Sequence, residues 1–189
     1  MVASSFRPAL LALLASASVL SACKKDNDDP TPDEDNEQIT TLRYELTPVG
    51  GGTTLTAQYR DVDGDGGTPA TITPATLVLA PNTTYTGKIV LLDETKNPAE
   101  DISAEVQEED DEHLFVFQTS GVNLTVSAAD RDKNNLPVGL ATQAVTGAAN
   151  ATGTTGTLKI TLRHQPGTKD GTATPGDTDV EVTFPTAVR

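Results

Sequence analysis

The sequence predicts an all-β protein, built as a single antiparallel β-sandwich of the immunoglobulin-like type with about eight or nine strands. Short segments in which apolar and polar residues alternate are typical of strands with one buried face. Clusters of Gly, Pro, Asn and Asp separate these segments at short intervals, as the turns of a sandwich require. A partly open barrel is the alternative arrangement.

The predicted strands follow one another along the chain from residue 41. Alternating patterns occur in the segments 41–46, 55–60, 122–128, 158–163 and 179–184. Denser apolar runs, typical of strands buried on both faces or central in a sheet, occur in 84–92, 113–118 and 138–145. In the last alternating segment we expect the apolar residues Val180, Val182 and Phe184 to face the core, and the polar residues Asp179, Glu181 and Thr183 to face solvent.

The segment 98–111 departs from this pattern and predicts one short helix. Asn97 can cap it, Pro98 suits the first helical position, and the apolar residues that follow lie four apart on one face. The acidic run Glu108–Glu112 then crowds the negative end of the helix dipole, which disfavours it. Solvent and salt, a bound cation or a basic partner are the alternatives for what offsets this charge.

The N-terminal segment has the pattern of a bacterial lipoprotein signal peptide. Arg7 precedes an apolar run that ends at Leu20 and is too short to span a bilayer. Small residues then precede Cys23, the single cysteine of the chain. We therefore expect a signal peptide over residues 1–22 and a lipid on Cys23. The alternative is an ordinary secreted chain in which Cys23 is a free thiol.

The remaining chain divides into a tether and a domain. Residues 23–37 are rich in acids, Pro, Thr and Asn, and predict a lipidated, acidic, disordered tether. Residues 38–189 show no repeat and no change in composition, so we expect one β-sandwich domain. Lysine followed by acids directly after the cysteine resembles the surface-export signal of Bacteroidota lipoproteins. The expected location is the outer membrane, on the cell surface or on the periplasmic face.

The net charge narrows the classes of partner. The chain carries a formal charge of −14 at neutral pH. Nucleic acid is therefore not expected as a partner, and anionic headgroups repel the domain, so that membrane attachment is expected through the lipid. Cations and basic protein surfaces are attracted.

The segment 61–67 is a candidate Ca²⁺ loop. Asp61, Asp63 and Asp65 alternate with other residues and a glycine follows, as in loops that wrap oxygen ligands around Ca²⁺. The position at which an EF-hand would supply its bidentate glutamate is Ile72. The alternative is an acidic hairpin loop without an ion.

The two histidines suggest a second, weaker candidate, a site for Zn²⁺ or a similar ion. His113 follows Glu109 by four residues and Glu112 by one, and His164 is in phase with the core-facing residues of its strand. If the sandwich brings them together, Glu109, Glu112, His113 and His164 can bind such an ion. The alternative is a pair of histidines that compensate local acids or bond to the backbone.

Catalysis is not expected. The cysteine is assigned to lipidation, no G-x-S-x-G elbow is present, and carboxylates are too frequent for their spacing to identify an acid–base pair. We therefore predict a protein that is not an enzyme.

The chain also resembles a family of small Bacteroidota lipoproteins labelled "type 1 periplasmic binding fold superfamily protein". The resemblance rests on the lipobox and on the segments 47–53, 60–67, 97–102, 162–167 and 177–185. It implies an accessory of a TonB-dependent outer-membrane receptor. The label names an α/β fold, whereas the strand pattern predicts the β-sandwich.

Two functions follow as hypotheses. The first is an anchored binding module that captures a metal ion or metal complex and passes it to an outer-membrane transporter. The second is a structural or interaction domain at the cell surface that Ca²⁺ stabilises and that has no role in transport.

Overall fold

A computed structural model of the chain describes Met1 and residues 37–64 and 67–189. The predicted signal peptide after Met1, the expected lipidation site Cys23, the predicted tether before Glu37, and Asp65 of the candidate Ca²⁺ loop lie outside the described residues. All strands and the helix belong to one compact unit, Glu34–Arg189. In the described part of the chain, no helix has the length and apolar character needed to cross a bilayer.

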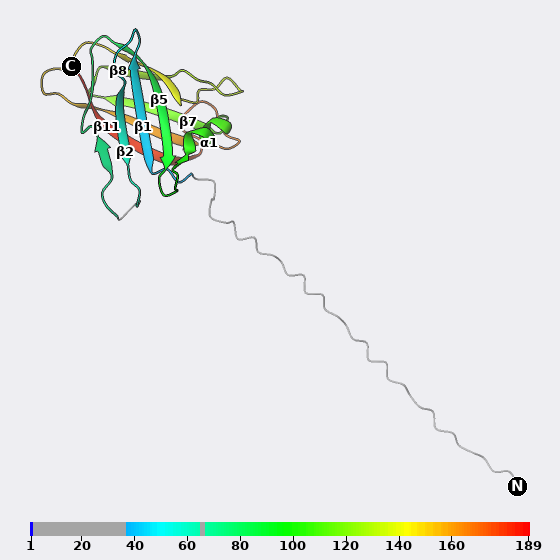
Figure 1. Ribbon diagram of the computed structural model, residues 1–189. Coiled ribbons are helices and arrows are strands. Elements are labelled where there is room, and N and C mark those ends of the chain that lie inside the picture. The colour runs from blue at the N-terminus through cyan, green and yellow to red at the C-terminus, as the bar shows by residue number, and fades with distance from the viewer. Residues whose placement is uncertain (2–36, 65–66) are drawn as a thin grey trace. The chain divides into compact units, whose positions relative to one another are not determined.

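The described residues form two β-sheets that pack as a sandwich, so the predicted all-β fold is confirmed (Figure 1). The first sheet has the strand order β3-β2-β1-β5-β9-β8, and β6 also pairs with β5. Its strands are β1 (Thr41–Pro48), β2 (Leu55–Arg60), β3 (Thr71–Thr73), β5 (Thr84–Asp93), β6 (Glu100–Asp101), β8 (Leu124–Ala128) and β9 (Ala141–Thr146). The second sheet has the order β4-β11-β10-β7. Its strands are β4 (Leu77–Leu79), β7 (His113–Ser120), β10 (Gly156–His164) and β11 (Asp177–Val188).

Each of the eight segments predicted as strands contains a strand. The structure adds β3, β4 and β6, which have two or three residues each and are too short to display an alternating pattern. β4 pairs with β11 in parallel, whereas the other neighbouring strands are antiparallel. The strand predicted over 138–145 begins only at Ala141, and its first residues belong to the preceding loop.

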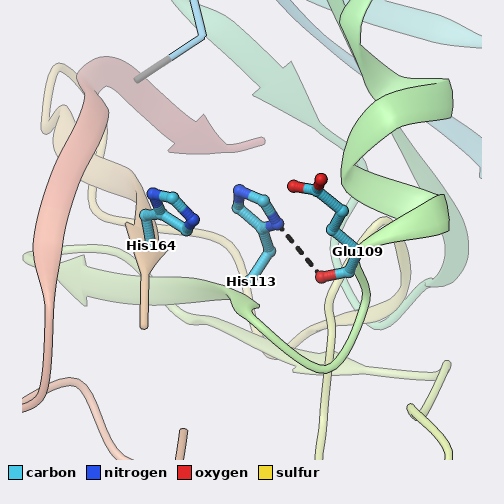
Figure 2. Close-up of side chains that lie close together, drawn as sticks. All are labelled: Glu109, His113 and His164. Atoms are coloured by element: carbon cyan, nitrogen blue, oxygen red, sulfur yellow. Dashed lines mark hydrogen bonds between the residues drawn. The ribbon is translucent and has the colours of Figure 1, made fainter. Parts of the chain in front are cut away.

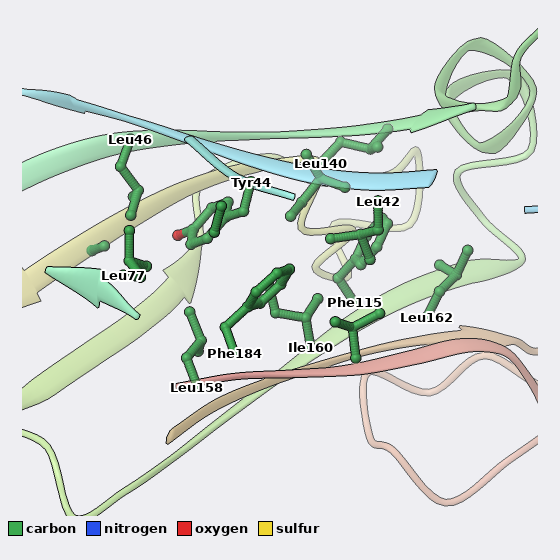
Figure 3. Packing of buried hydrophobic residues seen from close by; sticks show 14 of the residues in the cluster. Leu42, Tyr44, Leu46, Leu77, Phe115, Leu140, Leu158, Ile160, Leu162 and Phe184 are labelled. Carbon is green, nitrogen blue, oxygen red and sulfur yellow. The ribbon is translucent and has the colours of Figure 1, made fainter. Parts of the chain in front are cut away.

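The core lies between the two sheets (Figure 3). Leu42, Tyr44 and Leu46 of β1 point toward the residues of β10 and β11 on the other sheet, as the alternation along β1 predicts. Leu158, Ile160 and Leu162 of β10 and Phe184 of β11 meet them and are fully or almost fully buried. Burial of each such side chain contributes about 1.5–3 kcal/mol, so a core without tryptophan is sufficient for one sandwich.

The helix is shorter than predicted. α1 spans Ile102–Glu108, and its buried side chains are the expected apolar face, Ile102 and Val106. Asn97 is not the cap, because the residues that follow it form β6, which pairs with β5. Asp101 caps the helix instead, since its carboxylate accepts a hydrogen bond from the amide of Ser103. α1 packs beside β5, where the amide of Leu91 donates to the hydroxyl of Ser103.

Candidate metal centre

The two histidines meet across adjacent strands. His113 is the first residue of β7 and His164 the last residue of β10, and antiparallel pairing makes them direct partners. Their rings are stacked, with centroids 4.7 Å apart and planes at 4°. Both residues are buried, His113 completely and His164 to all but 7%. The inward direction of His164 was predicted from its phase with Leu162, and this prediction is confirmed.

Glu109, the C-terminal cap residue of α1, lies beside this pair (Figure 2). Ligand atoms of Glu109, His113 and His164 all lie within 4.8 Å of one another. Glu112 Oε2 lies 3.8 Å from His164 Nε2. The fold therefore brings together all four residues that the sequence proposed for a transition-metal site.

The ring of His113 has a defined orientation. Its Nδ1 lies 3.1 Å from the backbone carbonyl oxygen of Glu109. Because a carbonyl oxygen only accepts, Nδ1 carries the hydrogen and donates. In the neutral ring, Nε2 is then the nitrogen with the free lone pair.

Sequence reasoning missed two residues at this nitrogen. His113 Nε2 lies 3.4 Å from Glu37 Oε1 and 3.8 Å from Asp179 Oδ2. The side chain of Asp179 is 0% exposed, as is that of His113. Among the described residues, neither oxygen of Asp179, nor Glu37 Oε2, nor His113 Nε2 has a hydrogen-bond partner. Glu37 was assigned to the tether, and nothing in its local sequence indicated a contact with a strand so far along the chain.

The prediction that Asp179 faces solvent is wrong because β11 is irregular at this point. Leu162 pairs with Val180, but the next residue, Arg163, pairs with Thr178, so Asp179 is an extra residue in β11. Such a bulge disrupts the alternation and turns a side chain to the other face. The strands approach closely here, since a Cβ atom on Gly176 would collide with the carbonyl oxygen of His164.

Burial and charge shift the ionisation of these groups. Burial and the nearby charge of Glu37 raise the pKa of Asp179 to about 6. Burial opposes the charged form of His113, but the Glu37 carboxylate outweighs it and raises the pKa of His113. Burial likewise acts to raise the pKa of Glu37, but the neighbouring His113 lowers it below its ordinary value. Glu37 and His113 therefore favour their charged forms, whereas Asp179 resists ionisation.

An acidic cleft of about 540 Å³ reaches His164 of this pair. Its lining carries seven acidic side chains, among them Glu37, Glu109 and Glu112. Lys96 and His164 also line it. A cleft lined by one sign of charge raises the local concentration of the opposite ion, so this one attracts cations.

The acidic run after α1 is partly neutralised by lysines of the same chain. Lys133 Nζ lies 2.8 Å from Asp111 Oδ2, and Lys169 Nζ donates to the carbonyl oxygen of Asp110 at 2.7 Å. These contacts were not among the alternatives drawn from the sequence, because both lysines come from distant loops. Glu109 and Glu112 have no such lysine among the described residues and line the cleft.

The candidate Ca²⁺ loop joins β2 and β3. Asp61 Oδ1 accepts from the amide of Gly64 at 3.0 Å, and Asp63 Oδ2 accepts from the amide of Thr68 at 2.8 Å. The hydrogen bond from Thr68 lowers the pKa of Asp63. These two carboxylates therefore organise their own loop, and a Ca²⁺ site with Asp65 stays a prediction.

The donor set of the histidine cluster suits a transition metal. Imidazole nitrogens with carboxylate oxygens bind Zn²⁺ and similar ions, whereas Ca²⁺ and Mg²⁺ prefer oxygen donors alone. Comparison with protein families, with curated proteins and with solved structures finds no match to this chain. The case for a metal rests on the geometry of the cluster.

Proposed function

We propose that this protein is a lipid-anchored module of the outer membrane that captures a divalent transition metal ion or a small metal complex. The observation that carries the proposal is the stacked pair His113 and His164, with Glu109 within reach, at an acidic cleft. Two imidazoles with nearby carboxylates are the ligands of many zinc sites. In this proposal the lipid on Cys23 holds the module at the membrane, and a TonB-dependent receptor receives the metal.

Charge and size of the cleft support the capture of a cation. Acidic side chains dominate its lining, and the whole chain is negative, so long-range attraction favours a positive ligand. A volume of about 540 Å³ exceeds that of a bare ion and lies in the range of small-molecule sites. A hydrated ion or a small chelate can therefore enter before His164 meets the metal.

We propose binding and not catalysis because of the types of side chain that line the cleft. The described residues that line it include no Ser, Thr or Cys that could act as a nucleophile. His113 donates through Nδ1 to a backbone carbonyl, which is how metal-binding histidines are commonly held.

The alternative is a structural or interaction domain with Ca²⁺ in the 61–67 loop. It is second because the carboxylates of Asp61 and Asp63 already accept hydrogen bonds from their own loop. In this alternative the ion stiffens a hairpin and the protein has no role in transport.

Calorimetric titration of the purified protein with Zn²⁺ and with Ca²⁺ tests the two functions. We expect Zn²⁺ to bind with one ion per chain, and a double variant, His113→Ala with His164→Ala, to lose this binding. The double variant Asp61→Asn with Asp63→Asn is the matched control and should bind Zn²⁺ as the wild type does. If only Ca²⁺ binds, and the control variant loses it, the structural alternative holds.

Two cell experiments test the proposed location. A radiolabelled fatty acid should appear on the wild type and not on a Cys23→Ser variant. Protease added to intact cells should remove the domain if it lies on the surface, and full protection places it on the periplasmic face.

A further inference from the structure

We propose that Glu37 and Asp179, together with Nε2 of His113, are the inner ligands of this site, and that the bound metal clamps the start of the domain. The inference rests on the proposed function, since it requires that the site binds a divalent transition metal such as Zn²⁺. It goes further by naming the ligands and a structural consequence of binding.

The distances fit such an ion. Ligand atoms held tetrahedrally by Zn²⁺ at about 2.0–2.2 Å lie about 3.3–3.6 Å from one another. His113 Nε2 lies 3.4 Å from Glu37 Oε1 and 3.8 Å from Asp179 Oδ2. Ligand atoms of all three residues lie within 4.8 Å of one another, so side-chain movement alone would bring them around one ion.

The histidine is already arranged as a ligand. Its Nδ1–H donates to the carbonyl oxygen of Glu109, so Nε2 points toward the two carboxylates. Without a metal, Glu37 favours a proton on Nε2, and a bound ion would take the place of that proton. A backbone carbonyl on the other nitrogen is a common way to fix the ring of a metal ligand.

Four buried polar atoms around this point make no hydrogen bond to the part of the chain that the structure describes. Both oxygens of Asp179, Glu37 Oε2 and His113 Nε2 are buried and make no hydrogen bond among the described residues. Buried polar groups are normally satisfied, and a group that is not requires an explanation. A divalent cation that binds both carboxylates and the imidazole would give these four atoms a common partner.

The ion would join segments that are far apart in the sequence. Glu37 precedes β1 of the larger sheet, whereas His113 begins β7 and Asp179 lies in β11 of the smaller sheet. Glu37 also lines the acidic cleft, so it can meet an arriving ion. A bound metal would therefore tie the segment that enters β1 to the opposite sheet. Metal binding would then reduce the motion of residues 37–40, which follow the predicted tether.

Zn²⁺ titration of isosteric variants tests these ligands. We expect Glu37→Gln and Asp179→Asn each to weaken Zn²⁺ binding at least 100-fold. Asp63→Asn, which removes a distant exposed carboxylate, should leave the affinity within about twofold. The melting temperature of each variant is measured without metal as a control. Asp179→Asn should melt no lower than the wild type, which would show that the variant is folded and that its weaker Zn²⁺ binding comes from the lost ligand.

Hydrogen exchange provides the second measurement. Saturating Zn²⁺ should slow amide exchange in residues 37–40 at least tenfold in the wild type and leave it unchanged in Glu37→Gln. If the wild type binds Zn²⁺ but both variants bind it equally well, the inner ligands are wrong and the proposed function stands. If the wild type itself does not bind Zn²⁺, the proposed function fails as well. Zn²⁺ binding without slower exchange in residues 37–40 refutes the clamp.

Discussion

Asp132 and Asp179 are both buried to 0% side-chain exposure, yet their surroundings are opposite. Asp132 Oδ1 accepts from the amides of Asn134 and Leu136, each at 2.8 Å, and Oδ2 lies 2.9 Å from Lys169 Nζ. Asp179 accepts no hydrogen bond from the described residues and faces another carboxylate, Glu37. Asp132 thus has two amide donors and a lysine beside its carboxylate, whereas, in the described part of the chain, the carboxylate of Asp179 has only the imidazole of His113, at 3.8 Å.

The pKa values follow this difference. Burial acts to raise the pKa of Asp132, but Lys169 and the loop amides lower it below its ordinary value. Burial and Glu37 raise the pKa of Asp179 to about 6. Asp132 therefore stabilises the fold in its charged form, and Asp179 opposes folding unless a proton or a cation accompanies it. The comparison teaches that partners, and not burial alone, decide whether a buried carboxylate favours its charged form.

The largest effect is expected at the partnered carboxylate. Lys169→Met leaves Asp132 charged and buried with its amides alone, and we expect the free energy of unfolding to fall by about 3–5 kcal/mol. Urea denaturation at neutral pH measures this change. A loss below about 1 kcal/mol would mean that the ion pair of Asp132 with Lys169 contributes little to stability. The contrast between Asp132 and Asp179 would then be smaller than we infer.

The same substitution at both positions should have opposite signs. Asp132→Asn leaves Lys169 without its charge partner and should destabilise the protein by about 3 kcal/mol. Asp179→Asn removes a charge that resists burial, and should stabilise the metal-free protein by about 2 kcal/mol at neutral pH. Denaturation in the presence of a chelator compares the two. Destabilisation by Asp179→Asn would show that this carboxylate has a structural partner.

The pH dependence of stability isolates Asp179 further. Because its pKa in the folded state is above its ordinary value, the folded protein binds the proton more tightly than the unfolded chain. Metal-free stability should therefore fall by about 1–2 kcal/mol as the pH rises through the interval from about 4 to 6. Glu37, His113, His164 and Arg163 face this group and add their own pH dependence. Subtracting the profile of Asp179→Asn leaves the part that belongs to Asp179, and a zero difference would contradict its raised pKa.

The smallest effect is expected at an exposed pair beside the same loop. Lys133 is 69% exposed and lies 2.8 Å from Asp111. Lys133→Ala should leave the melting temperature nearly unchanged, because solvent screens such pairs. A clear drop in the melting temperature would show that the lysine neutralises the acidic run after α1 more strongly than its exposure suggests.

Much of the fold could be predicted from local patterns. The alternation of Leu42, Tyr44 and Leu46 predicts both β1 and its buried face, because side chains on a strand point alternately to its two sides. The three strands of two or three residues were missed, since such lengths contain no period. The helix was predicted in the correct region but with the wrong cap, because the pairing of β6 with β5 decides where α1 begins.

The candidate site was predicted in part. Glu109, Glu112 and His113 are neighbours in the sequence, and the phase of His164 directs its ring inward, so these residues could be named in advance. Glu37 could not be named, because its partners lie in the other sheet, and Asp179 was assigned to the wrong face. Its direction depends on the bulge opposite Leu162 and Arg163, which local residue types do not reveal.

The sequence by itself determined the periodic features of this protein: an all-β chain, the buried faces of its main strands, its negative charge, and the types of ligand available to a metal. Only the tertiary structure decided which side chains meet. The register of β7 against β10 stacks His113 on His164, and the bulge in β11 turns Asp179 toward them. Contacts between distant segments depend on strand pairing and on its irregularities, and these arise from packing of the whole sandwich.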